Sequence, residues 1–204
     1  MHSQTRHTLR RLRHLESDQV TAMHYVIHLD PGRPAEDQIR SFWRSLADQG
    51  ISPRELATSG TPHVTVMSSA PFPLASFSKD LVSIARDFEP FEITFSHLGI
   101  FPGQPSVLFL GVSHTSTLSS LHRRLYDLLS PTVEVFDFAR PDVSVFHCTL
   151  GYIARRHDLP SAVELAYDAS LPGKVNVNGF DVVECGETTS HHLATFTFGK
   201  RNDI

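Results

Sequence analysis

The sequence feature that most restricts the fold is a repeated pattern, His-x-Thr followed by an apolar residue, at His63–Val66 and again at His147–Leu150. In an extended strand, residues i and i+2 point to the same face, roughly 7 Å apart. Each copy would therefore present an imidazole and a hydroxyl on one face and two apolar side chains on the other. A slip of one residue would bury the histidine and expose the apolar pair, so the register is strongly specified. The pattern predicts two half-buried strands.

The segments around these motifs alternate between strand-like and helix-like patterns from Met23 onward. Alternation with a period of two predicts strands, and apolar residues spaced three and four apart predict helices. About eight strands and roughly four helices in mixed order favour an α+β fold with mostly antiparallel sheets. Because the motif recurs, we expect a duplicated, two-lobed arrangement. Strands are expected at 23–29, 62–68, 91–95, 107–112, 144–153, 174–184 and 193–198, and helices at 34–49, 74–88, 115–129 and 159–167.

Residues 1–22 differ from the rest, because they carry several arginines and few apolar side chains. We interpret them as a basic extension without a fold of its own. An organelle-targeting peptide is an alternative, which Glu16 and Asp18 make less favourable. A third interpretation is that Met23 is the biological start. Residues 23–204 are then expected to form a single bilobal domain.

Composition excludes some functions and locations. The net charge of −4 means that no global basic field draws in nucleic acid, so a polyanion would have to bind a local patch. The two cysteines, Cys148 and Cys185, lack metal-ligand spacing and suit a reducing compartment. No apolar run is long enough to cross a bilayer. We therefore expect a cytoplasmic monomer with no metal, no cofactor and no membrane partner.

The two His-x-Thr motifs, with Leu98–Gly103 and Val107–Val112 between them, resemble those of the two-histidine (2H) phosphoesterases. This superfamily contains 2′-5′ RNA ligases and 2′,3′-cyclic phosphodiesterases. The resemblance covers residues 23–198. It implies a bilobal, pseudo-twofold α+β fold, with flanking helices and two motif strands that meet at a central cleft. It also implies activity on 2′,3′-cyclic phosphates or 2′-5′ phosphodiester bonds without a metal.

The chemistry of the motif residues fits this implication. Histidine titrates near neutral pH, so one imidazole can take a proton from water while its partner gives one to a leaving oxygen. Our hypothesis is that His63 and His147 are this acid–base pair and that the Thr65 and Thr149 hydroxyls hold the phosphate oxygens. Which histidine is the base stays open. The alternative is that the histidines have no catalytic role and the threonines are simply good strand formers.

Substrate contacts are less well indicated. The second motif is followed by Gly151 and Tyr152, where many family members carry a small residue and then arginine, so a phosphate-binding cation is missing. Tyr152 is a candidate for stacking on a base, although its odd offset from His147 slightly favours a core position. Phe101, in the segment between the motifs, is a second stacking candidate with core packing as its default. Arg155 follows the motif strand and either reaches a phosphate or lies in a solvated turn.

Two further histidines, His24 and His28, share a strand face and either line the cleft or lie on the surface. The expected function is metal-independent hydrolysis of 2′,3′-cyclic phosphates carried by nucleotides or RNA ends. One alternative is a 2′-5′ RNA ligase or 2′-5′ phosphodiesterase. Another is a catalytically weak module of the same fold that binds a nucleotide or RNA.

Overall fold

The computed structural model describes residues 23–57, 60–187 and 189–199. Residues 1–22, which we interpreted as a basic extension or a targeting peptide, lie outside these ranges. In chain order the elements are β1 (His24–Leu29), α2 (Arg33–Asp48), α3 (Arg54–Ala57), β2 (Val64–Ser69), α4 (Leu74–Arg86), β3 (Phe91–Phe101), β4 (Ser106–Val112), α5 (Ser116–Leu129), β5 (His147–Ile153), α6 (Leu159–Asp168), β6 (Lys174–Val177), β7 (Gly179–Cys185) and β8 (Ser190–Thr197).

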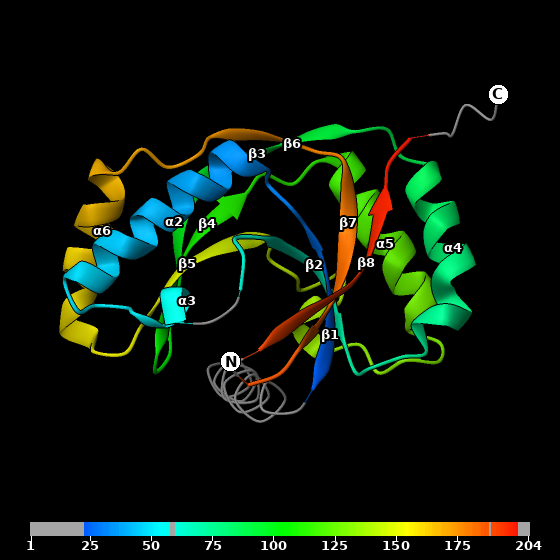
Figure 1. The fold of residues 1–204 in the computed structure, drawn as a ribbon, viewed down its shortest axis with the longest axis horizontal. Helices are drawn as coiled ribbons and strands as arrows, with labels where there is room; N and C mark the ends of the chain where they lie inside the picture. Colours follow the sequence, from blue (N-terminus) through cyan, green and yellow to red (C-terminus); the bar gives the residue numbers. More distant parts are fainter. Residues whose placement is uncertain (1–22, 58–59, 188, 200–204) are drawn as a thin grey trace, which may run out of the picture.

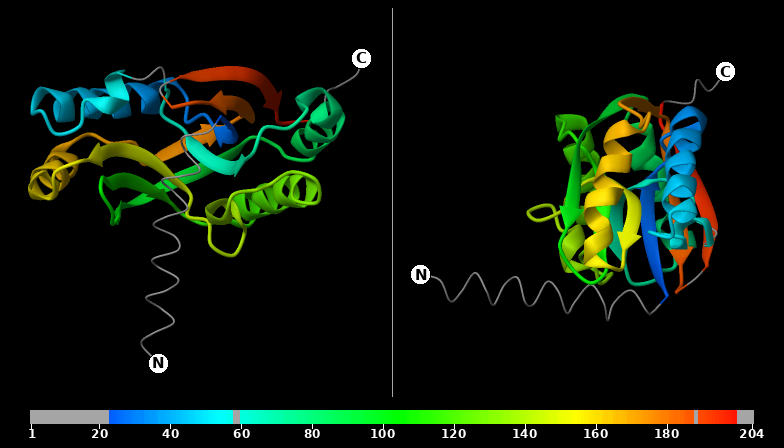
Figure 2. Two further views of the ribbon diagram at one scale, coloured as in Figure 1. Left: turned by 90° about the horizontal axis from the view of Figure 1, so that it is seen from below. Right: turned by 90° about the vertical axis from the view of Figure 1, so that its left-hand side faces the viewer.

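The strands form two four-stranded antiparallel sheets, in the orders β2-β1-β7-β8 and β5-β4-β3-β6. The prediction of an α+β fold with two antiparallel sheets is confirmed. Two helix pairs flank the sheets at opposite ends of the molecule, α2 with α6 and α4 with α5 (Figures 1 and 2). Helix α2 packs on β5, whereas α4 and α5 pack on β8 and β2. Each motif strand, β2 or β5, is the edge strand of its own sheet.

The helices follow the predicted periodicity. Helix α2 has a proline in its first turn, where no backbone donor is lost, and ends just before Gly50, which has a φ of +65°. Helix α5 begins at the predicted place, where the Thr115 side chain accepts a hydrogen bond from the backbone N–H of Leu118 (3.2 Å). The short helix α3 was not predicted, because four residues are too few to show a period.

Besides shifts of up to three residues at strand ends, as in β5 and β8, two of the expected strands are organised differently from the observed ones. The segment predicted as one strand over 174–184 forms two strands, because the chain leaves one sheet and enters the other at Asn178. Strand β6 pairs with β3, and β7 pairs with β1. Conversely, 91–95 and the expected linker after it form one strand that ends at Phe101, with a register shift between Phe95 and His97. The first part of β3 pairs with β6 and the second part with β4.

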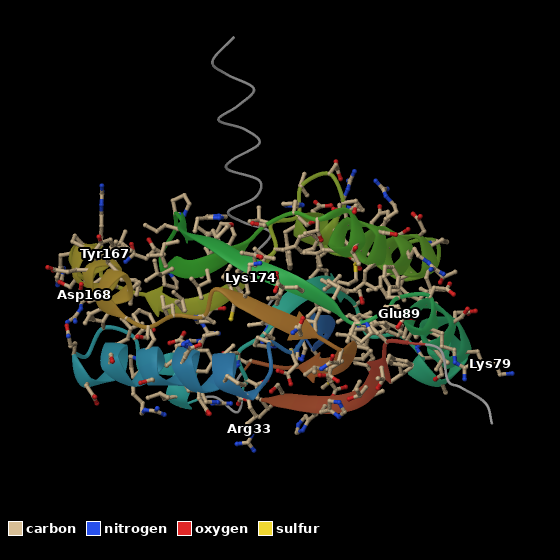
Figure 3. All side chains as sticks on the ribbon, turned by 90° about the horizontal axis from the view of Figure 1, so that it is seen from above. Arg33, Lys79, Glu89, Tyr167, Asp168 and Lys174 are labelled. Carbon is tan, nitrogen blue, oxygen red and sulfur yellow. The ribbon has the colours of Figure 1, made fainter. Side chains whose placement is uncertain are left out.

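The crossover between the sheets lies in the middle of the molecule. Figure 3 shows Lys174, at the start of β6, between Tyr167 of α6 at one end of the molecule and Lys79 of α4 at the other. One hydrophobic core includes residues of both sheets and of the helices that pack on them, so each sheet with its helices forms one lobe around a shared core. It includes the apolar motif residues Val64, Val66, Cys148 and Leu150, none of which is more than 2% exposed. The register predicted for the two motifs is therefore confirmed. Within the described residues, no helix is long and apolar enough to cross a membrane.

The crossover predicts a stability effect at Gly179. A Cβ at this position would lie 2.3 Å from the carbonyl oxygen of Phe196, a backbone atom of β8 that cannot rotate away. We expect Gly179→Ala to lower the free energy of unfolding by about 1–3 kcal/mol, measured by chemical denaturation. Gly173→Ala is the matched control, since nothing lies within 4 Å of a Cβ there, and it should change stability by less than about 0.5 kcal/mol. Equal stability of the two variants would contradict the close approach of β7 and β8.

Candidate active site

A β-bulge in β5 decides which of its side chains share a face. Thr149 pairs with Phe109 of β4, but Gly151 pairs with Leu108, so Leu150 is an extra residue. The bulge reverses the alternation and puts Tyr152 on the same face as His147 and Thr149. Tyr152 is half-buried on this face. The slightly favoured prediction of a core position for Tyr152 is therefore wrong, because that prediction assumed uninterrupted alternation.

Strand β2 has a similar irregularity. Thr65 pairs with His28 of β1, and the next pair, Met67 with Ile27, shows that Val66 is the extra residue. His63 directly precedes the strand and shares the face of Thr65 and His28. Both bulges lie within the first four residues of their strands. The apolar residues stay buried while each His–Thr pair points out of the core.

The fold brings the two motifs together. Strands β2 and β5 contact one another and meet near the centre of the molecule (Figure 1). The thiol of Cys148 lies beside the backbone of His63, and positive charge on His147 lowers the pKa of His63. His63 and His147 thus belong to one site, with Thr65 and Thr149 beside them on their strands.

Each imidazole is oriented by a hydrogen bond of the same kind, from Nδ1 to a backbone carbonyl two residues upstream. Nδ1 of His63 lies 2.7 Å from the carbonyl oxygen of Thr61, and Nδ1 of His147 lies 2.6 Å from that of Val145. A carbonyl oxygen only accepts, so each Nδ1 must carry the proton. In the neutral ring, Nε2 is then left with a lone pair. Each imidazole is therefore held in the tautomer that a general base requires.

The surroundings favour the neutral form of both rings. Burial lowers the pKa of His63 to about 4, with smaller contributions from the charges of His28 and His147, while the Thr61 carbonyl acts in the opposite direction. Burial also lowers the pKa of His147, opposed by the hydrogen bond to Val145. Without a bound anion, both histidines thus favour the neutral form, in which Nε2 carries a lone pair.

His63 lies next to a polar network that the sequence did not indicate. The ring of His28 stacks on that of His63, with centroids 4.6 Å apart, and its Nε2 lies 3.7 Å from a carboxylate oxygen of Asp181. Asp181 also accepts hydrogen bonds from Thr195 and from His192 (3.3 Å). Burial raises the pKa of Asp181, but the hydrogen bonds outweigh this and hold it well below its usual value. A carboxylate therefore faces His28 across the strand pair.

His24 and His28 are both buried, with 9% and 7% exposure, so the surface alternative for them is wrong. The two residues share one face of β1, as predicted from their spacing. Nothing local in the sequence indicated Asp181 or His192, because β7 and β8 reach this site only through sheet pairing.

His147 has aromatic neighbours instead. Its ring centroid lies 4.9 Å from that of Phe101 and 5.1 Å from that of Phe109, and the two phenyl rings stack at 4.3 Å. The Phe109 ring occupies the space that a Cβ at Gly99 would fill (2.2 Å). Phe101 is the last residue of β3, and its half-buried ring lies at the site.

The other candidate residues lie farther along β5. The guanidinium of Arg155 pairs with Asp158 (2.6 Å) and donates to the carbonyl oxygen of Gly50 (3.1 Å), so its charge is already compensated. The Tyr152 ring lies beneath the guanidinium of Arg54, 4.3 Å from its carbon atom. In residues 23–57, 60–187 and 189–199, no group of three or more His, Cys, Asp or Glu side chains is arranged to hold a metal ion.

Known proteins are similar to this chain in sequence and in fold. A family model described as the 2′-5′ RNA ligase superfamily matches residues 31–188. The RNA 2′,3′-cyclic phosphodiesterase of Archaeoglobus fulgidus is 28% identical over 95 residues, or 46% of this chain. The match spans 52% of that protein, about half of its length.

Solved structures extend the likeness to most of the chain. E. coli LigT in apo form has a TM-score of 0.59 and 16% identity, covering 87% of this chain and 98% of LigT. LigT complexed with 3′-AMP gives a TM-score of 0.55 and 14% identity, over 86% of this chain and 97% of LigT. A crystal structure of a phosphoesterase has a TM-score of 0.53 and 18% identity, covering 88% of this chain and 100% of that protein. At these identities the likeness shows the fold.

The stacking of His28 on His63 predicts how the pKa of His63 responds to substitution. His63 should titrate with a pKa of about 4, well below the ordinary 6.5, when its Cε1 proton is followed by NMR. His28→Gln should raise this pKa, because it removes a neighbour whose positive charge opposes protonation of His63. His157→Gln, at a side chain that is 77% exposed, is the control and should leave it unchanged. A His63 pKa that is the same in all three proteins would contradict the proposed coupling.

Proposed function

We propose that this chain, which belongs to the 2′-5′ RNA ligase superfamily, hydrolyses 2′,3′-cyclic phosphates of nucleotides or RNA ends, with His63 and His147 as its acid–base pair. The observation that carries the proposal is the matched pair of imidazoles, each with Nδ1 bound to a backbone carbonyl and Nε2 available for a proton. The relatives support it: one is an RNA 2′,3′-cyclic phosphodiesterase, and LigT was crystallised with 3′-AMP.

The proposed reaction needs two proton transfers, one from water to a histidine and one from the other histidine to the leaving ribose oxygen. Water attacks the phosphorus of the cyclic diester and gives a proton to the neutral Nε2 of one histidine. The bond between phosphorus and one ribose oxygen breaks, and the other histidine, in its protonated form, gives its proton to that oxygen. The products are a ribose monophosphate and a free hydroxyl. The two histidines end with exchanged protonation states, which proton exchange with solvent resets.

The reaction needs one protonated imidazole, although both pKa values are lowered in the free protein. The negative charge of a bound phosphodiester favours the protonated form of a nearby imidazole and so raises its pKa. Substrate binding would therefore prepare the acid, while the neutral partner remains the base. This coupling makes proton uptake on binding an expected property of the site.

The threonines suit the role of phosphate ligands. Thr65 and Thr149 are half-buried beside their histidines, and within the described residues neither hydroxyl makes a side-chain hydrogen bond. Each can donate to a non-bridging oxygen, where negative charge develops as water attacks. On the β5 side, the half-buried ring of Phe101 lies next to His147 and can contact the nucleoside part of the substrate, while the buried Phe109 ring supports it from behind.

Histidine substitutions test the proposal directly. We expect His63→Ala and His147→Ala each to lower kcat for 2′,3′-cyclic AMP by about 10²–10⁴-fold, because each removes one proton transfer. Turnover is measured by chromatography, which also identifies the 2′- or 3′-monophosphate product. His157→Ala, on the exposed turn after β5, is the control and should keep wild-type activity. Near-native turnover by either site variant would overturn the acid–base assignment.

Metal independence is tested separately. Turnover of 2′,3′-cyclic AMP should be the same before and after dialysis against a chelator, because two imidazoles and two hydroxyls supply all the groups that the proposed mechanism uses. Loss of activity that a divalent cation restores would contradict this mechanism. Binding of cyclic AMP with no turnover under either condition would instead identify a binding module of the same fold.

A further inference from the structure

The sheet face that carries His147 extends well beyond it. Strand pairing arranges the face in three rows across β5, β4 and β3, and Tyr152 stands in the row farthest from His147. From Gly111 to Val107 on β4, which pair with these two residues, the strand rises about 13 Å. The rows are His147–Gly111–His97, Thr149–Phe109–Gly99 and Tyr152–Val107–Phe101.

The segment before α3 is anchored to this far end. The hydroxyl of Ser52 donates to the Glu55 carboxylate (2.7 Å) and accepts from the backbone N–H of Tyr152 (3.1 Å). Ser52 and Glu55 are 1% and 6% exposed. Burial raises the pKa of Glu55, against the effect of the Ser52 hydrogen bond. This buried anchor holds α3 against the edge of β5 and so fixes the position of Arg54.

Arg54 and Tyr152 together form a flat, charged surface. The guanidinium carbon of Arg54 stands 4.3 Å from the centroid of the Tyr152 ring, close enough for a cation–π contact. Arg54 is exposed and takes part in none of the salt bridges found among the described residues. Its charge favours the ionised form of the buried Glu55 beside it, whereas the Arg155 guanidinium is held in an ion pair with Asp158.

A hollow adjoins this surface. It has a volume of about 310 Å³ and is lined by Arg54, Tyr152, Gln104, Pro105 and Ala154, together with residues 51–53. The β3–β4 turn forms one wall and the segment leading into α3 forms another. The hollow therefore opens onto a guanidinium plane that is backed by an aromatic ring.

We propose that this hollow is a second nucleotide subsite, which binds the penultimate nucleotide of an RNA strand, on the 5′ side of the one that carries the cyclic phosphate. A base stacks on the guanidinium plane of Arg54, with the Tyr152 ring behind it, and the edge N–H groups of Arg54 donate to a phosphate. The inference rests on the proposed function. The terminal nucleoside occupies the Phe101 side of His147, so a free cyclic nucleotide leaves the second subsite empty. The preferred substrate class is an RNA 3′ end that carries a 2′,3′-cyclic phosphate.

The test compares two substrates, 2′,3′-cyclic AMP and a short oligoadenylate that ends in a 2′,3′-cyclic phosphate. We expect wild-type protein to have the higher kcat/KM for the oligonucleotide, mainly through a lower KM. In Arg54→Ala, the ratio of the two kcat/KM values should fall about tenfold, the order expected for loss of one stacked base. The effect should shrink at high salt, because it includes a phosphate contact.

Two further variants make the result specific. Arg44→Ala removes an exposed arginine from the neighbouring α2 and should keep the wild-type ratio. Tyr152→Phe should keep most of the preference and Tyr152→Ala should lose it, because the aromatic ring rather than the hydroxyl supports Arg54. An unchanged ratio in Arg54→Ala, or an equal loss for both substrates, overturns the subsite. Absence of turnover of both substrates by wild-type protein overturns the proposed function instead.

Discussion

The contact between two edge strands, β2 and β5, is the constraint on which the site depends. Each strand buries the apolar residues of its motif in the shared core and must therefore turn its histidine and threonine outward. Because the strands belong to different sheets, their outward faces meet at a single place between the lobes. Burial of apolar side chains, about 25 cal/mol per Å² of area removed from water, thus positions groups that contribute little to the core themselves.

The two halves of the site are alike in backbone and different in surroundings. Both histidines bind a carbonyl two residues upstream through Nδ1, so their tautomers match. His63 then stacks on His28, which Asp181 faces, whereas His147 stands against two phenyl rings. A duplicated motif therefore provides two imidazoles in different electrostatic environments. Such a difference suits a reaction in which one ring accepts a proton and the other donates one.

The face beyond His147 changes the interpretation of one departure from the family pattern. The sequence has Tyr152 where the resemblance led us to expect arginine, which predicted the loss of a phosphate-binding cation. The structure brings a guanidinium to this position from α3, since Arg54 lies over the Tyr152 ring. The buried Ser52 and Glu55 hold α3 in place through the backbone of the same tyrosine. A cation absent from the strand is thus supplied by a neighbouring element, and sequence comparison at position 152 alone does not find it.

The sequence by itself determined the features that depend on local periodicity: an α+β chain, most of its elements, and the outward direction of His63, Thr65, His147 and Thr149. These follow because alternation with a period of two specifies a strand face without knowledge of its partner. Only the tertiary structure decided the bulge that turns Tyr152 to the site face, the sheet crossover at Asn178, and the approach of Asp181 and Arg54. Each of these depends on which strands pair and pack, and strand pairing joins residues whose separation along the chain carries no periodic signal.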